Sequence, residues 1–112
     1  MRAQVFTQLA LTGNTTFEVS QAVSMNGANA AQVDCVIFAL TGSATVTFIL
    51  QESNDLENWS TKATLATAPT AVGYSLQGQT TAISTAYVRL KATLTGSSPI
   101  AVLSAGINTA AL

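Results

Sequence analysis

Apolar and polar residues alternate with a period of two in three separate segments of this chain, and this alternation constrains the fold more than any other feature. The segments are residues 15–25, 44–52 and 86–94. Successive side chains of a strand point to opposite faces of a sheet, so each segment is predicted to be a strand with one buried face. The residues expected on the buried faces are Phe17, Val19, Val23 and Met25; Val46, Phe48 and Leu50; and Val88, Leu90, Ala92 and Leu94.

Turn residues separate these segments from further short apolar ones. The tripeptide Leu-Thr-Gly closes three predicted strands, at residues 11–13, 40–42 and 94–96, and a glycine there can adopt the positive φ of a tight reversal. No segment has a sustained helical stripe. The pattern predicts an all-β fold, a single antiparallel β-sandwich of about eight short strands, jelly-roll or immunoglobulin-like, with residues 1–112 as one domain. The additional predicted strands are residues 4–11, 33–40, 60–66, 72–77 and 100–107.

Charged residues are unusually scarce, at 8% of the chain against about 25% in an ordinary soluble domain. One interpretation is that other chains cover much of the surface, and the other is that a Thr-rich β surface is soluble without help. The terminal segments 1–11 and 100–112 are apolar and nearly uncharged. They are candidates for intersubunit strands or arms, although they could instead pair with each other inside one domain.

Composition also weighs against several classes of function. The net charge is −1 and no segment clusters Lys or Arg, so binding to nucleic acid is not expected. No apolar run approaches the roughly 18 residues of a membrane-spanning helix, and no export signal is recognised. The chain has no histidine, which excludes Ser-His and Cys-His catalysis. We therefore expect no enzyme activity, no catalytic residue and no cofactor.

Two local features could still suggest chemistry. Cys35 lies in an apolar run, where a structural thiol in the core is the favoured interpretation over a nucleophile. Glu52, Asp55 and Glu57 could form a calcium loop or a pair of hydrolase carboxylates, but their spacing matches no known calcium motif. A polar hairpin tip is the simpler interpretation, and no metal site is predicted.

The hairpin of residues 46–65 contains the most distinctive motif. Ser53, Asn54 and Asp55 are short polar residues that can cap a reversal through their side chains. Trp59 follows at the start of the returning strand. Its ring could cover the open end of the core while its N–H finds a partner, or it could stack on a sugar.

This Ser-Asn-Asp-x-x-x-Trp hairpin resembles small β-sandwich domains of bacteriophage virion proteins and discoidin-like carbohydrate-binding sandwiches. The glycine that usually follows Asp55 in that pattern is replaced by Leu56, so the turn is expected to differ. Residues 86–90, Ala-Tyr-Val-Arg-Leu, are similar to a Tyr-x-Arg strand of the same domains. The resemblance implies a structural role in a particle, as a capsid decoration or minor coat protein.

The sequence thus predicts a non-enzymatic virion structural protein that self-associates or that decorates and cements a phage-like capsid or tail. Its expected partners are copies of itself and a major capsid or tail protein, in a virion assembled in the host cytoplasm. The alternative is a carbohydrate-binding or adhesive module that uses Trp59, Tyr74 and the loop of residues 54–58. The candidate interaction residues are Val5, Leu9, Leu11, Trp59, Tyr74, Ile107 and Leu112.

Overall fold

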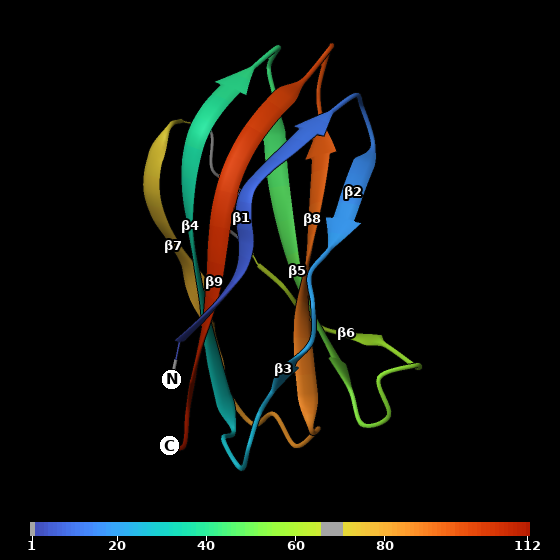
Figure 1. Ribbon diagram of the computed structural model, residues 1–112, viewed down its shortest axis with the longest axis vertical. Helices are drawn as coiled ribbons and strands as arrows, with labels where there is room; N and C mark the ends of the chain where they lie inside the picture. The colour runs from blue at the N-terminus through green and yellow to red at the C-terminus, as the bar shows by residue number, and fades with distance from the viewer. Residues whose placement is uncertain (1, 66–70) are drawn as a thin grey trace.

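Nine β-strands form two antiparallel sheets that pack face to face in the computed structural model, which describes residues 2–65 and 71–112 (Figure 1). The strands are β1 (Arg2–Thr12), β2 (Thr16–Val19), β3 (Val23–Ser24), β4 (Ala30–Thr41), β5 (Thr45–Ser53), β6 (Ser60–Thr64), β7 (Gly73–Thr80), β8 (Tyr87–Thr95) and β9 (Ile100–Ala110). Within the described ranges no helix is present that could cross a bilayer. The predicted all-β sandwich is confirmed.

The strand order identifies the sandwich as a jelly roll. The first sheet has the order β1-β9-β4-β7, and the second has the order β2-β8-β5-β6, with β3 also paired to β8. When β2 and β3 are counted as one interrupted strand, the first strand pairs with the last, the second with the seventh, the third with the sixth and the fourth with the fifth. This wrapping of a long antiparallel ribbon gives the jelly-roll form of the two-sheet sandwich.

The buried faces of β5 and β8 follow the predicted alternation. The side chains of Val46, Phe48 and Leu50 are buried on β5, and the predicted apolar face of β8 is fully buried opposite them. The dense apolar run of β4 contributes Val33, Cys35 and Ile37 to the same core, and β9 contributes Leu103 and Ile107. Removal of this apolar surface from water is the main favourable contribution to folding.

The prediction that Phe17, Val19, Val23 and Met25 share one buried face was wrong for the first two residues. Val23 and Met25 are buried as predicted, whereas Phe17 and Val19 are exposed on the outer face. The cause is a bulge: Val19 pairs with Lys91 and Val23 with Val88, so three residues lie opposite two on β8. One extra residue reverses the side to which the following side chains point.

Ser20 lies in this bulge and closes the gap that it makes in the hydrogen-bond ladder. Its backbone N–H donates to the Leu90 carbonyl at 2.8 Å, and its hydroxyl accepts from the Leu90 N–H at 2.9 Å. The hydroxyl also donates to the Gln21 carbonyl at 2.9 Å. Ser20 is buried, so these bonds replace water that cannot reach the β8 backbone.

Two of the three predicted glycine turns lie against each other at one end of the sandwich. Gly42, between β4 and β5, and Gly96, between β8 and β9, both have positive φ, of 70° and 146°. A Cβ atom on Gly42 would overlap the Ser98 carbonyl oxygen, and one on Gly96 would lie 2.7 Å from the Ser43 carbonyl oxygen. Glycine is needed here for close backbone approach as well as for φ.

The other strand boundaries differ from the predictions by a few residues. The predicted strand of residues 60–66 is β6 up to Thr64, and its last predicted position, Ala66, lies outside the described residues, as does Met1. Strand ends are set by turn and loop contacts rather than by periodicity. Among residues 2–65 and 71–112, four elements have an edge without a strand partner: β1 and β7 in the first sheet, β6 in the second, and the interrupted strand β2 and β3.

Candidate functional site

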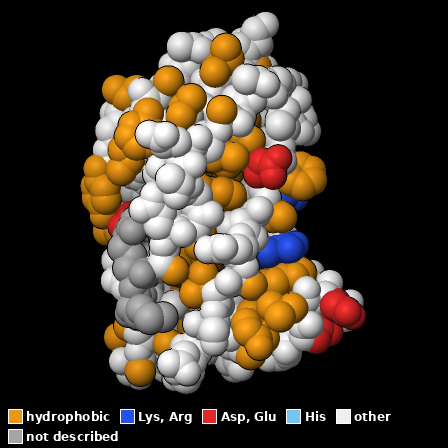
Figure 2. Space-filling view, in the orientation of Figure 1, with side chains coloured by type: hydrophobic (Ala, Val, Ile, Leu, Met, Phe, Trp, Pro, Cys, Tyr) orange, Lys and Arg blue, Asp and Glu red, His pale blue; other side chains and the backbone are white. Residues whose placement is uncertain are grey.

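The outer face of the first sheet carries an exposed apolar strip along β4 and β7. We call Phe38, Val72, Tyr74 and Leu76 the apolar strip; they are 51%, 63%, 67% and 50% exposed. Val36, half-buried, pairs directly with Tyr74 and so lies within the strip. Figure 2 shows hydrophobic side chains gathered along the edge where β7 lies. Contiguous exposed apolar surface of this kind is typical of a contact site.

The edge strand beside the strip has little protection against pairing with another chain. β7, Gly73–Thr80, contains no Lys, Arg, Asp, Glu or Pro, the residues that commonly block edge strands. A bulge at Gln77 interrupts only its second half. By contrast, β1 is bulged at two places, and the short strands β2 and β6 carry Glu18 and Lys62.

The hairpin tip between β5 and β6 is organised around one carboxylate. Asp55 Oδ1 accepts hydrogen bonds from the backbone N–H groups of Asn58 at 2.8 Å and Glu57 at 2.9 Å, and from the Ser53 hydroxyl at 3.0 Å. Its Oδ2 accepts from the Asn58 side chain at 2.7 Å. These bonds, with those from Asn58 the strongest, hold the pKa of Asp55 well below its usual range. The predicted side-chain cap of the reversal is confirmed.

Leu56 occupies the position where the related pattern has glycine. Its φ is +66°, a conformation that glycine adopts freely and other residues adopt at a cost. Leu56 thus takes a left-handed conformation at the position where the resembled pattern has glycine. The backbone N–H of Leu56 donates to the Ser53 hydroxyl at 3.0 Å, which helps to hold this geometry.

Trp59 lies half-buried on the outer face of the second sheet rather than over the end of the core. The Arg89 guanidinium stacks on its ring, 4.3 Å from the centroid, and the Arg89 Nε donates to the Gln51 side chain at 2.7 Å. The indole N–H donates to the Leu56 carbonyl at 3.2 Å, which is the kind of partner expected for it. With Arg89 on the ring, the Trp59 ring has one face already occupied.

A second cation and ring pair lies on the same face. The Lys91 ammonium is 4.4 Å from the centroid of the Phe17 ring. Exposed Phe17 is thus partly covered by a charge. On the other sheet, the Tyr74 hydroxyl of the apolar strip donates to Asp34 Oδ2 at 3.5 Å. The outer faces of the two sheets therefore differ: one carries cations stacked on aromatic rings, and the other carries exposed apolar side chains beside one carboxylate.

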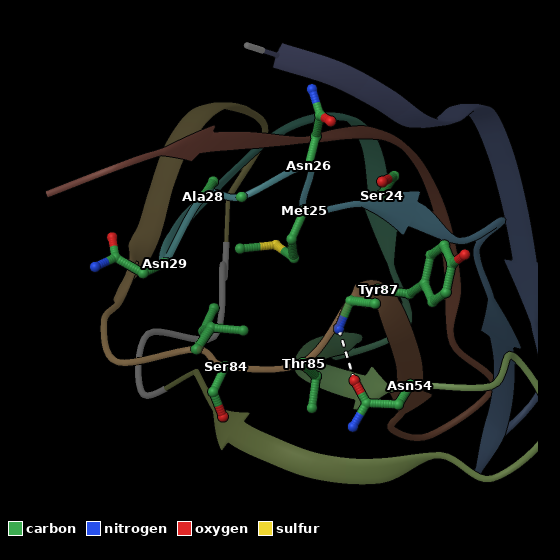
Figure 3. A pocket seen from close by; sticks show the side chains of 12 residues that line it. Ser24, Met25, Asn26, Ala28, Asn29, Asn54, Ser84, Thr85 and Tyr87 are labelled. Carbon is green, nitrogen blue, oxygen red and sulfur yellow. Dashed lines mark hydrogen bonds between the residues drawn. The ribbon is translucent and has the colours of Figure 1, made fainter.

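A pocket of about 480 Å³ opens at the end of the sandwich, at the bottom of Figure 1. Three loops form it: residues 24–29 between β3 and β4, residues 83–87 before and at the start of β8, and Asn54 from the hairpin tip (Figure 3). Asn26 and Gly27 both have positive φ, and the Ala28 N–H donates to the Met25 carbonyl at 2.8 Å. The turn at Asn26 and Gly27 thus forms one wall of the pocket.

Cys35 is buried in the core, where its thiol lies 3.8 Å from the Gln77 amide nitrogen. Burial, followed by the nearby charge of Asp34, raises the pKa of Cys35 to about 11. A thiol in this state is a poor nucleophile at neutral pH. This environment agrees with a structural role.

The structure brings the two terminal segments together within the chain. β1 pairs with β9, so Leu11 and Ile107 are buried in the core and Val5 and Leu9 pack against it. Leu112 is exposed. The two segments thus pair with each other inside one domain, as the second interpretation has it. Among the described residues, the outer edge of β1 and exposed Leu112 stay candidates for intersubunit contact.

The acidic residues of the hairpin do not gather around a common point. Across residues 2–65 and 71–112, no three His, Cys, Asp or Glu side chains lie close enough to hold a metal ion. Asp55 is used by the turn itself. Oε2 of Glu52 is buried with no hydrogen-bond partner among the described residues, and we have no physical account of it.

Two features of the surface were missed by reasoning from sequence. Tyr74 was a candidate, but its neighbours Phe38, Val72 and Leu76 were not. A signal existed, because residues 35–40 are apolar on both faces of a predicted strand, which indicates contact on both sides. The end pocket had no such signal, since its walls come from three separate loops.

No protein-family model matches this chain, and a search of curated proteins finds none with significant similarity. Fold alone does not determine function. The surfaces described above are therefore the features from which function can be inferred.

Proposed function

We propose that this chain is a non-enzymatic structural subunit of a phage-like virion that associates with copies of itself through the apolar strip and the β7 edge. The observation that carries the proposal is the apolar strip, because its side chains are half to two-thirds exposed in a chain with only 8% charged residues. A surface with few charges and one apolar face is suited to being covered by protein. A shell or tail protein of the particle is the second partner that this surface would fit.

The exposed area of the strip is too small for side-chain contacts alone to hold a stable interface. A whole aromatic side chain has an area of about 150–250 Å². Scaled by their exposed fractions, the four side chains of the strip together expose on the order of 400 Å². At roughly 25 cal/mol per Å², covering that area contributes on the order of 10 kcal/mol. Association itself costs about 4–15 kcal/mol. Strand pairing along β7 would therefore be needed alongside the strip.

The residues of β7 permit such pairing. Two copies related by a two-fold axis would place their β7 strands side by side and continue one sheet into the other. Gly73 to Leu76 form the regular half of the strand, before the bulge at Gln77. The strips of the two copies would then join into one larger apolar face on the outer side of the continued sheet, and the shell or tail protein is the partner that would cover it.

Leu76→Lys tests the proposal, and Leu56→Lys is its matched control. The two leucines are 50% and 49% exposed, but Leu56 lies on the hairpin tip away from the strip. Leu76 pairs with Asp34, so a lysine there gains an opposite charge across the strands and the fold should be retained. Circular dichroism checks the fold of each variant.

Sedimentation velocity then measures the mass of each protein as a function of concentration. We expect wild type and Leu56→Lys to form the same oligomer and Leu76→Lys to shift to monomer. A wild-type chain that stays monomeric at about 1 mM, where even interactions worth roughly 4 kcal/mol are seen, would refute self-association. An oligomer that Leu76→Lys leaves unchanged would refute the choice of surface.

A further inference from the structure

We propose that the pocket at the end of the sandwich is a binding site for a neutral saccharide. The site consists of residues 24–29 and 83–87 with Asn54, and it lies apart from the apolar strip. The inference is independent of the proposed self-association, because it depends on a different surface and a different chemistry.

The pocket has the size and stability of a preformed site. Its volume of about 480 Å³ is within the range of roughly 300–1,000 Å³ for small-molecule sites. Backbone hydrogen bonds join its walls: Met25 N–H to the Ala86 carbonyl at 2.8 Å, and Ile83 N–H to the Asn29 carbonyl at 3.0 Å. The Ala86 N–H donates to Asn54 Oδ1 at 3.0 Å and fixes the third wall. A ligand would not have to order these loops.

The lining selects against ions. None of the described side chains that line it is a carboxylate, an ammonium or a guanidinium, and the phenol of Tyr87 is the one titratable group among these described residues. A charged ligand would lose hydration on entering and would meet no opposite charge. The ligand should therefore be uncharged, and its polar groups should be satisfied by amides and hydroxyls.

The arrangement of the lining matches the two-sided character of a pyranose ring. Met25 and Ile83 are almost fully buried and form an apolar floor. Figure 3 shows Met25 directed to the middle, with Asn26, Asn29 and Ser84 at the rim, where their polar ends extend outward. An apolar floor can take the C–H face of a sugar while amides and hydroxyls at the rim take its hydroxyl groups.

Several polar groups at this rim are available to a ligand. The side chains of Asn26 and Ser84 are exposed, and neither is engaged in the hydrogen bonds of the described residues. Asn29 is different, because its amide holds both the N–H and the carbonyl of Leu112. The hydroxyl of Thr85 is buried and lacks a partner among the described residues.

The test is a titration of the full chain, labelled with ¹⁵N, with a panel of neutral sugars: glucose, galactose, mannose, N-acetylglucosamine, maltose and cellobiose. We expect saturable amide shifts for at least one sugar, confined to residues 24–29, 54 and 83–87. The dissociation constant should be near the millimolar range, equivalent to roughly 4 kcal/mol. Sulfate and acetate at the same concentrations should produce no such shifts.

Asn26→Gly combined with Ser84→Ala is the loss variant. Glycine keeps the positive φ of residue 26, so the turn should survive the loss of the amide. Asn108→Ala is the matched control, because Asn108 is an exposed asparagine on β9 that does not line the pocket. We expect the loss variant to weaken binding at least tenfold and the control to bind as wild type.

Three outcomes would overturn the inference. The first is that no sugar causes localised amide shifts up to about 50 mM, where binding worth only roughly 2 kcal/mol would be visible. The second is that the shifts are centred on Trp59 or Tyr74 instead of the pocket. The third is that the loss variant binds as tightly as wild type. Because the sedimentation experiment reports on the apolar strip alone, failure of one proposal is distinguishable from failure of the other.

Discussion

Replacing Ser20 with alanine should destabilise the sandwich far more than its size suggests. The Ser20 hydroxyl is the acceptor for the Leu90 N–H at 2.9 Å, and Leu90 is completely buried in the middle of β8. Alanine removes the acceptor and leaves this backbone donor without water or protein. An unpaired buried donor costs about 1–3 kcal/mol. With a urea m-value of about 1.5 kcal/mol/M, a loss of roughly 2 kcal/mol lowers the unfolding midpoint by about 1.3 M.

Urea unfolding followed by circular dichroism measures the loss, and amide hydrogen exchange locates it. The Leu90 amide should exchange faster in Ser20→Ala, measured relative to the amides of neighbouring β8 residues. Ser24→Ala is the control, since that hydroxyl is exposed and its removal should change stability by no more than about 0.5 kcal/mol. If Ser20→Ala unfolds at the wild-type midpoint and Leu90 keeps its protection, the bulge does not depend on this hydroxyl.

Three further predictions concern other parts of the fold. In the same unfolding assay, Gly42→Ala should destabilise the protein by about 3 kcal/mol or more, and Gly27→Ala by only about 1 kcal/mol. Both glycines have positive φ, which is costly for alanine. They differ because a Cβ atom would overlap backbone atoms at Gly42 but would meet open space at Gly27. Equal losses would contradict the close approach of the two turns. Because the pKa of Cys35 is raised to about 11, its thiol should react with a thiol reagent at pH 8 only after unfolding. The free energy of unfolding should fall as pH rises above 9.0, the ordinary pKa of a thiol, since the unfolded chain then loses a proton that the folded chain keeps. Fast labelling of the native protein would show an open core. The carboxyl ¹³C shift of Asp55 should show that this group is still ionised at pH 3. Because the pKa of Asp55 is lowered in the folded state, its contribution to stability is complete above the unfolded pKa of about 3.9 and is lost as pH falls toward the folded pKa. A midpoint near 4 would mean that the cap is not formed.

Periodicity was sufficient to predict the strands that face the core on one side. β5 and β8 lie in the middle of the second sheet, and their alternation is uninterrupted. It failed at Phe17 and Val19, because one extra residue near Ser20 reverses the pattern and no residue type marks a bulge of this kind. An alternation in sequence can thus span two strands whose apolar residues point to opposite sides of the sheet.

The candidate surfaces were harder to predict than the fold. Tyr74 was selected for its aromatic ring, but its position in a strip depends on β4 and β7 being neighbours, which alternation alone does not determine. Trp59 was placed correctly at the start of the returning strand, but its ring packs under Arg89, a residue on β8. Contacts between strands distant in sequence follow from topology, and the jelly-roll and immunoglobulin-like orders were equally compatible with the pattern.

The pairing of β1 with β9 has a consequence for how the chain reaches this state. The Gln8 N–H donates to the Ser104 hydroxyl at 3.0 Å across 96 residues of sequence, so the first sheet closes only after most of the chain has been brought together. Sheets built from such distant partners fold slowly, in roughly milliseconds to seconds. Until closure, hydrophobic segments of neighbouring molecules can meet, and refolding yield should fall with rising protein concentration unless a chaperone keeps the chains apart.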